Sequence, residues 1–386
     1  MRWHREDMDE NTTLTPFRID IPQADLDDLH DRLARARLPH PVPGRTGRDD
    51  FSRGIPTPYL RELVEYWRDE FDWRAQEATL NELAQFTTVV DRQTFHVVHV
   101  RSANPAATPL LLNHGWPGSF VEYKRLVPLL TDDFHVVVSS PPGFGFSTPL
   151  SGTGWEIVRT ADAFAEIMTR LGYAEFAVHG TDMGIGTTGH LAAAYPERVI
   201  GTHLGGDRRV LGMVGDVFPC PEDLTEDERA QLDAVRTEHA TDHGYLAMQR
   251  YRPDTIGPAL TDSPVGQLAW IAEKFRTRAR GVDRTPDTSV DRDQLLTNIA
   301  LYWFTRGGAS SAQLYFEAEH AEPEPPVPSD VPSGWAVFDA HPLVRRVLDP
   351  SRAIAHWSEF TEGGHFPAME EPQLLADDIR AFFSGW

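Results

Sequence analysis

The sequence predicts an α/β fold, in which helices cover both faces of a mostly parallel sheet. Short runs rich in β-branched residues start near residue 86 and alternate with helical stretches. These runs are apolar on both faces, which is typical of strands buried on both sides. With 40% hydrophobic residues, the 386-residue chain can bury a large core. The predicted core strands are "FHVVHV", "PLLLNHG", "FHVVVSS", "FAVHG" and "VIGTHLGG".

Residues 1–85 are expected to form an N-terminal accessory region that wraps around the core. The segment 14–38, "LTPFRIDIPQADLDDLHDRLARARL", begins extended and continues as an amphipathic helix with leucines at helical spacing. The stretch "HPVPGRTGRDD" interrupts this pattern with proline and glycine. A second helical stretch follows between Tyr59 and Leu83.

A helical insertion divides the predicted core into two parts. Residues 86–210 form the first part, and residues 331–386 form the second, with the strands "WAVFDA" and "AIAHWSEF" and the closing helix "PQLLADDIRAFF". Between them, residues 211–330 carry long helical patterns such as "DQLLTNIALYWF" and are expected to form a cap, or lid. The proline-rich "AEPEPPVPSDVPSG" predicts a stiff linker back to the core.

The charge of the chain bears on its partners. The sequence has 36 Lys and Arg against 58 Asp and Glu residues, a formal net charge of −22. This excess repels phosphate backbones and anionic membrane surfaces, so neither nucleic acid nor a membrane is an expected partner. The single cysteine, Cys220, excludes an intrachain disulfide framework and fits a reducing compartment. Because no apolar run approaches the ~18–20 residues that span a bilayer, and no signal peptide is recognisable, we expect a cytoplasmic protein.

The stretch "VHGTDMGIGTTGH", residues 178–190, allows two interpretations. Starting at Gly180, it is a Gly-x-Asp-x-Gly turn that would raise Asp182 out of the chain as a nucleophile. Starting at Gly184, it is a Gly-x-Gly-x-x-Gly turn that would cradle a dinucleotide, with Asp207 near the distance expected for a ribose-binding acid. The glycine fingerprint alone is weak, because glycines also let a helix pack closely on a strand.

Three other motifs favour the nucleophile. "NHGWPGSF" follows a strand and would aim backbone N–H groups at the crevice beyond the carboxyl ends of the strands. "PPGFGFS" follows the next strand, and "EGGHFPAMEEP" places His365 in a glycine-rich loop after the last strand. A nucleophile, an acid and a histidine in this chain order are typical of the α/β-hydrolase fold.

The ordered set of motifs resembles the epoxide hydrolases of the microsomal and juvenile-hormone type, in their soluble bacterial form, over nearly the whole chain. The resemblance implies an α/β-hydrolase fold with a helical cap, hydrolysis of a small-molecule epoxide by water to a vicinal diol, and no cofactor or metal. A homodimer is one option for the oligomeric state. The matching segments include "PFRIDIPQADLDDLHDRLARARLP", "NHGWPGSFVEY", "GTDMGIG", "GYLAMQRYRPDTIGPALTDSPVGQLAWIAEKF", "SSAQLYFE" and "GGHFPAMEEPQLLADDIRAFF".

The residue types suit this chemistry. A carboxylate such as Asp182 would form an alkyl ester, whose carbonyl water can attack, whereas a serine would form an ether that water cannot cleave. His365 would activate the hydrolytic water. The backbone N–H groups of Trp116 and Met183 would stabilise the tetrahedral intermediate, where the loss of one donor typically costs ~3–4 kcal/mol.

The proton donors to the epoxide oxygen are expected to be phenols from the cap. The resemblance assigns this role to Tyr245 in "GYLAMQ" and to Tyr315 in "SSAQLYFE". Tyr251 and Tyr302 lack a matching motif and are expected to be structural.

The acid behind His365 is the least defined member of the site. An ungapped match to the family places His341 where an Asp or Glu is usual. We therefore predict Asp339, two residues earlier, with Asp207 and Asp349 as alternatives. Among the pocket residues, His114 is expected to brace the oxyanion turn, and Pro117, Phe144 and Phe146 to line the pocket together with Trp116.

Other functions fit the residues less well. A haloalkane dehalogenase also uses an Asp nucleophile, but it commonly has a Trp after it to bind the halide, where this chain has Met183. A ligand-binding homologue without activity gains support only from the undefined acid. No His-Glu-x-x-His metal motif is present. The resemblance leaves open whether the pathway is detoxification or secondary metabolism.

Overall fold

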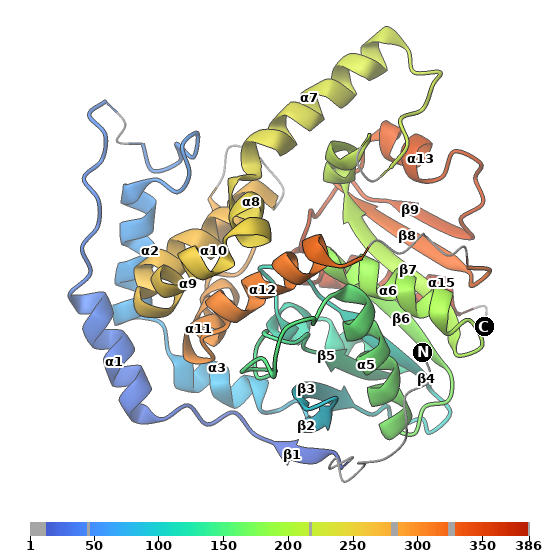
Figure 1. Ribbon diagram of the computed structural model, residues 1–386, viewed down its shortest axis with the longest axis horizontal. Helices are drawn as coiled ribbons and strands as arrows, with labels where there is room; N and C mark the ends of the chain where they lie inside the picture. The colour runs from blue at the N-terminus through green and yellow to red at the C-terminus, as the bar shows by residue number, and fades with distance from the viewer. Residues whose placement is uncertain (1–12, 45–46, 216–217, 279–284, 323–328, 385–386) are drawn as a thin grey trace.

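The computed structural model describes residues 13–44, 47–215, 218–278, 285–322 and 329–384. Its centre is a nine-stranded sheet in the order β1-β2-β3-β5-β4-β6-β7-β8-β9 (Figure 1). The first three neighbouring pairs are antiparallel and the remaining pairs are parallel, so the predicted fold class is confirmed. The strands are β1 (Thr15–Phe17), β2 (Gln85–Val90), β3 (Gln93–Val100), β4 (Thr108–Asn113), β5 (Phe134–Ser139), β6 (Phe176–Thr181), β7 (Val199–Asp207), β8 (Ser333–Phe338) and β9 (His356–Glu359).

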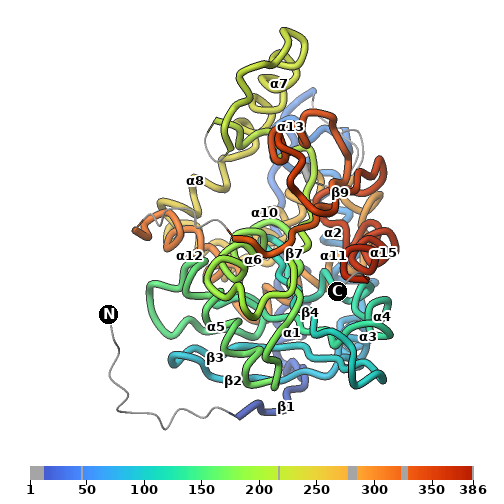
Figure 2. The backbone as a smooth tube through the Cα atoms, turned by 90° about the vertical axis from the view of Figure 1, so that its right-hand side faces the viewer, coloured from blue at the N-terminus to red at the C-terminus, as the bar shows by residue number. Residues whose placement is uncertain are grey.

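Successive residues of the central strands enter hydrophobic clusters on opposite faces of the sheet. Leu110 and Leu112 of β4 belong to one cluster and Leu111 belongs to the other. Figure 2 shows α5 and α6 on one side of the strands and α4 and α15 on the other. These helices and the neighbouring short ones are η1 (Phe120–Lys124), α4 (Val127–Leu130), α5 (Ile157–Arg170), α6 (Met183–Ala194), α13 (Pro342–Leu348), α14 (Pro367–Glu370) and α15 (Pro372–Phe383).

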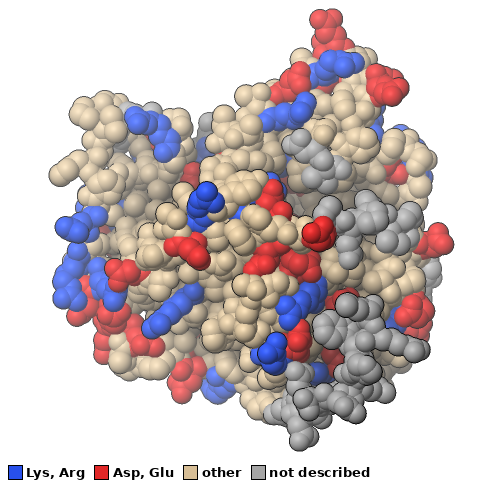
Figure 3. Space-filling model, in the orientation of Figure 1, with Lys and Arg blue, Asp and Glu red and all other residues tan. Residues whose placement is uncertain are grey.

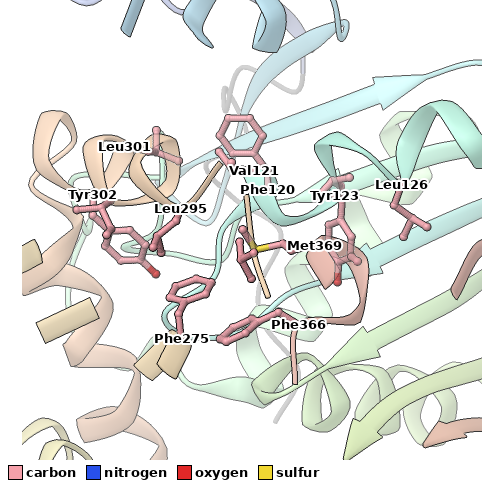
Figure 4. Packing of buried hydrophobic residues seen from close by; sticks show 14 of the residues in the cluster. Phe120, Val121, Tyr123, Leu126, Phe275, Leu295, Leu301, Tyr302, Phe366 and Met369 are labelled. Atoms are coloured by element: carbon pink, nitrogen blue, oxygen red, sulfur yellow. The ribbon is translucent and has the colours of Figure 1, made fainter. Parts of the chain in front are cut away.

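A helical layer separates β7 from β8 along the chain. Phe275 of this layer stacks on Phe366, the residue after His365, with ring centroids 4.2 Å apart (Figure 4). This contact ties the layer to the loop that carries the histidine. The elements are η2 (Arg208–Met213), α7 (Glu226–Asp242), α8 (Gly244–Tyr251), α9 (Pro253–Asp262), α10 (Pro264–Arg278), η3 (Pro286–Thr288), α11 (Arg292–Phe304) and α12 (Gly307–His320).

The N-terminal segment packs on this helical layer as well as on the sheet. Its β1 pairs with β2, and its helices are α1 (Gln23–Ala34), α2 (Thr57–Asp69) and α3 (Trp73–Leu80). Figure 1 shows α1 and α2 beside α9 and α10. The Tyr66 hydroxyl donates to Asp293 of α11 at 2.8 Å. On the face shown in Figure 3, acidic and basic side chains are interspersed, so the negative net charge does not form one continuous patch there.

Local predictions differ from the structure in two places. The helical stretch predicted between Tyr59 and Leu83 is two helices, because the Asp72 side chain accepts a hydrogen bond from Ala75 N and starts α3 anew. Strand β2 was not predicted, since the turn that joins it to β3 is Asp91-Arg92, with φ of 48° and 61°, and lacks the glycine that usually marks such a hairpin. Residues 323–328 of the predicted proline-rich linker lie outside the described residues.

Candidate active site

The turn between β6 and α6 places Asp182 at the carboxyl end of the sheet. Asp182 has φ 52° and ψ −125°, a positive φ that costs a non-glycine residue roughly 1–3 kcal/mol. A Cβ on Gly180 would lie 2.4 Å from the Gly184 carbonyl oxygen, and one on Gly184 would lie 2.2 Å from the Asn113 carbonyl oxygen. The two glycines are therefore required by close packing around a raised aspartate.

This geometry decides between the two interpretations of the glycine-rich stretch. The Gly-x-Gly-x-x-Gly fingerprint lies within α6, and not in the turn before the helix where a pyrophosphate would bind. Gly186 packs on Ile157, and a Cβ on Gly189 would meet no atom within 4 Å. The turn is thus the one that the Gly-x-Asp-x-Gly interpretation predicts, and the role of Asp182 as a nucleophile stays a prediction.

His365 lies between two carboxylates. Its Nε2 is 3.0 Å from Asp182 Oδ2, and its Nδ1 is 3.3 Å from Asp207 Oδ2. Asp207 is the last residue of β7, whereas His365 comes from the loop between β9 and α14. Three segments far apart in sequence thus bring together a carboxylate, an imidazole and a second carboxylate, the arrangement of a nucleophile, a base and an orienting acid.

Asp207 is buried and firmly held. Its Oδ1 accepts from Arg209 N at 2.7 Å, and its Oδ2 accepts from Arg209 Nη2 at 2.8 Å. Burial alone would raise the pKa of the Asp207 carboxyl, but the Arg209 guanidinium and the hydrogen bond from His365 outweigh it and hold the pKa below the usual range. The Asp207 carboxyl is therefore ionised at neutral pH.

The assignment of Asp339 as this acid is corrected by the structure. Asp339 has φ 45° and forms an ion pair with Arg208 at 3.0 Å, on a side chain that is 42% exposed. His341 accepts from Leu343 N and caps α13. Asp349 accepts from Ala353 N at 2.6 Å and closes the turn after α13. Of the three candidate acids, Asp207 is the one whose carboxylate reaches the imidazole.

The turn of "NHGWPGSF" approaches the nucleophile as expected. The Trp116 N–H donates to Asp182 Oδ1 at 3.0 Å, and a Cβ on Gly115 would lie 2.2 Å from the same oxygen. The Met183 amide begins α6 directly after the nucleophile. His114 is buried, its Nδ1 lies 3.1 Å from the Gly115 carbonyl oxygen, and burial lowers its pKa to about 4. A neutral His114 thus braces the turn.

Two tyrosines from the helical layer meet at Trp116. The ring of Tyr245, on α8, stacks on Trp116 at 4.9 Å, and the ring of Tyr315, on α12, meets it edge-on at 6.2 Å. The other two tyrosines lie elsewhere: Tyr302 donates to the Gly118 carbonyl oxygen at 2.7 Å, and Tyr251 donates to Glu319 on the surface. The structure therefore brings together the pair that the motifs singled out.

Sequence models of known families match two overlapping parts of the chain. The model described as "Epoxide hydrolase N terminus" matches residues 14–123, and the "alpha/beta hydrolase fold" model matches residues 108–204. The chain is 39% identical to a putative epoxide hydrolase of Stigmatella aurantiaca, over 96% of this chain and 84% of that protein. It is 34% identical to epoxide hydrolase 1 of Oryctolagus cuniculus, over 97% and 89% of the two chains. The chain belongs to the epoxide hydrolase family.

Solved structures of other epoxide hydrolases agree with this assignment. The Aspergillus niger epoxide hydrolase superposes with a TM-score of 0.82 at 27% identity and 98% coverage of both chains. The juvenile hormone epoxide hydrolase of Bombyx mori gives 0.83 at 26% identity, over 97% of this chain and 95% of that one. Among the described residues of this epoxide hydrolase, no helix has both the length and the hydropathy needed to cross a bilayer.

The predicted pocket residues divide into two groups. His114 and Phe144 line a small cavity of about 10 Å³ beside Met183. Phe146 packs on Phe17 with ring centroids 4.8 Å apart, and the Pro117 carbonyl accepts a hydrogen bond from Asn298 of α11. The place of these two residues in a pocket wall stays a prediction. A larger cavity of about 710 Å³ lies between the cap, η2 and the N-terminal segment, and its lining includes Phe51, Arg209, Tyr245, Met248, Trp270 and Lys274.

Sequence reasoning missed Glu122, a buried acid close to the site of this epoxide hydrolase. Thr181, the residue before the nucleophile, donates to Glu122 Oε1 at 3.4 Å. A Cβ on Gly118 would lie 2.5 Å from Glu122 Oε2, so the carboxyl fills the space beside the oxyanion turn. Burial raises the pKa of Glu122 to about 8. The nearby His365 lowers this pKa, and the charge of Asp182 raises it further. The sequence did contain a signal for Glu122, because it is the only acidic residue in the motif "NHGWPGSFVEY".

Proposed function

We propose that this epoxide hydrolase opens its substrate to a vicinal diol through a covalent ester on Asp182. The observation that carries the proposal is that the two oxygens of the Asp182 carboxylate have different partners. Oδ1 accepts from the Trp116 N–H at 3.0 Å, while Oδ2 faces His365 Nε2 at 3.0 Å. Oδ1 therefore lies where an oxyanion would be stabilised, and we assign the attack on carbon to Oδ2, the oxygen on the side of His365.

In the first half-reaction, Asp182 Oδ2 attacks an epoxide carbon and the carbon–oxygen bond of the ring breaks. The departing alkoxide takes a proton from the hydroxyl of Tyr245 or Tyr315, and the resulting phenolate recovers a proton from solvent. Both phenols reach the site from the cap and contact the same indole, which supports a shared role on the leaving oxygen. The cavity of about 710 Å³ that Tyr245 lines is our candidate for the substrate's approach.

In the second half-reaction, a water attacks Cγ of the ester and gives its proton to His365 Nε2. The negative charge develops on Oδ1, where the Trp116 and Met183 amides stabilise it. The bond between Cγ and Oδ2 then breaks, and the imidazolium returns the proton to the departing diol. The Asp182 carboxyl keeps the second proton of the water, loses it to solvent and is again a carboxylate. Asp207, buried and ionised beside Nδ1, would stabilise that imidazolium and hold the ring in place.

A single turnover in ¹⁸O-water tests this route, because the oxygen from water should remain on the enzyme. With enzyme in excess over a styrene-oxide-like probe, mass spectrometry of the peptide containing Asp182 should show a gain of one ¹⁸O, and the diol should carry none. Label in the diol after one turnover would refute the covalent step. Asp182→Ala should form no ester, and Tyr251→Phe, which alters a phenol on the surface, should behave as the unaltered enzyme.

A further inference from the structure

A second cluster of chemically active side chains lies beneath the C-terminal helix, apart from the triad. His203 on β7 and His356 on β9 both direct Nε2 at the carboxylate of Asp378 on α15, each at 2.9 Å. One donor atom from each of the three side chains lies within 4.8 Å of the other two. The Ser358 hydroxyl adds an oxygen 3.2 Å from His356 Nε2. Three separate elements thus converge on one point.

The geometry points to a binding site for one divalent first-row transition-metal ion, with His203, His356 and Asp378 as ligands. Two imidazoles and a carboxylate suit Zn²⁺, Co²⁺ or Ni²⁺, whereas Mg²⁺ and Ca²⁺ prefer a shell of oxygens. Metal–ligand bonds of ~2.0–2.2 Å in a tetrahedron separate the donors by about 3.3–3.6 Å. The two nitrogen–oxygen spacings of 2.9 Å are below this range, and all three donors lie within 4.8 Å of one another, so side-chain rotations have to bring them to equal separations around the ion.

The surroundings of His203 are those of an oriented ligand. Its Nδ1 lies 2.9 Å from Nδ1 of the buried His179, so one proton is shared between these two atoms. In this structure His203 Nε2 lies 2.9 Å from the Asp378 carboxylate and donates to it. An ion would displace that proton, and His203 would then donate its Nδ1 proton to His179 while Nε2 binds the ion. Hydrogen bonding of the second ring nitrogen in this way is a regular feature of metal-binding histidines.

An ion can reach the cluster, and a bound ion would connect two elements on either side of the His365 loop. His203 and Asp378 are buried, but the His356 side chain is 24% exposed on the edge strand, so an ion can reach the site from that side. His356 and Asp378 lie before and after the loop that carries His365. An ion bound between them would fix both ends of that loop. The proposed ester chemistry needs no ion, so the two proposals fail independently.

Titration of the chelator-treated full chain with Zn²⁺ or Co²⁺ tests the site. We expect one ion per chain by calorimetry, a rise in Tm with Zn²⁺, and visible absorption bands from tetrahedral Co²⁺. His356→Gln, on a partly exposed edge strand where folding is least at risk, should abolish all three. The matched control is His190→Gln, which alters a His–Asp pair of 3.3 Å with only two donors and should leave binding intact.

Three results would overturn the inference. The first is the absence of stoichiometric binding by the unaltered chain, and the second is unchanged binding by His356→Gln. An equal rise in Tm with Mg²⁺ would also contradict it, because these ligands should discriminate against that ion. Hydrolysis of the epoxide probe, followed in the same samples, separates this outcome from any failure of the proposed catalytic route.

Discussion

Replacing Asp207 by asparagine should slow hydrolysis of the ester far more than its formation. The Asp207 carboxylate lies 3.3 Å from His365 Nδ1, and at an effective dielectric constant of ~20 its attraction for an imidazolium is about 5 kcal/mol. Because Arg209 shares the same oxygen at 2.8 Å, part of this attraction is already offset. We expect a loss of about 3–5 kcal/mol in the hydrolytic step, or roughly 10²- to 10⁴-fold in rate.

Rapid mixing followed by an acid quench and mass spectrometry of the Asp182 peptide measures both steps at once. The ester should form within a few-fold of the normal rate in Asp207→Asn, which also shows that the variant is folded, and it should then accumulate. Asp339→Asn is the matched control, since its carboxylate pairs with Arg208 on the surface and should not affect either step. Normal ester hydrolysis in Asp207→Asn, or slow hydrolysis in Asp339→Asn, would refute the assignment of the acid.

Three further predictions concern other parts of the site. The pKa of Glu122 is raised from an ordinary value of 4.5 to about 8, so between these pH values the folded chain keeps a proton that the unfolded chain loses. The free energy of unfolding should therefore fall by up to about 1.4 kcal/mol per pH unit in this range. Urea titrations of Glu122→Gln should show a flatter pH dependence. Converting both Tyr245 and Tyr315 to Phe should slow ester formation by roughly 10²- to 10⁴-fold, and either change alone by less, in single-turnover assays. Gly184→Ala should prevent stable folding in thermal melts, whereas Gly189→Ala, where a Cβ meets no neighbour, should raise stability by about 1 kcal/mol.

Each of these predictions has an outcome that contradicts it. For Glu122→Gln, an unfolding free energy with the same pH dependence as the unaltered chain would show that the carboxyl does not hold its proton. Ester formation at the normal rate in the double Phe variant would remove the phenols from the leaving-group step. A folded, stable Gly184→Ala variant would mean that the backbone around Asp182 can shift to accommodate a Cβ.

Short-range patterns were enough for much of the fold and for the two central catalytic candidates. Asp182 could be found because the two glycines that its turn requires lie two residues away on either side. The steric requirements of the turn can therefore be recognised within five consecutive residues. The strands of the parallel sheet were recognisable because burial on both faces requires apolar residues on both, as in "FHVVVS" and "FAVHGT". The hairpin between β2 and β3 was not, because Asp91-Arg92 reaches positive φ without a glycine.

The partner of His365 could not be decided in the same way. Asp207 and Asp339 lie at strand ends and Asp349 follows α13. Only the path of the chain determines which of these carboxylates meets the imidazole. The same holds for Glu122, whose raised pKa comes from burial among residues distant in sequence. The sequence by itself determined which residue types were present and which turn raised the nucleophile, because those depend on sterics between near neighbours. The tertiary structure alone decided the acid, the buried carboxyl and the cluster beneath the C-terminal helix, because contact distance and desolvation arise only when separate segments pack together.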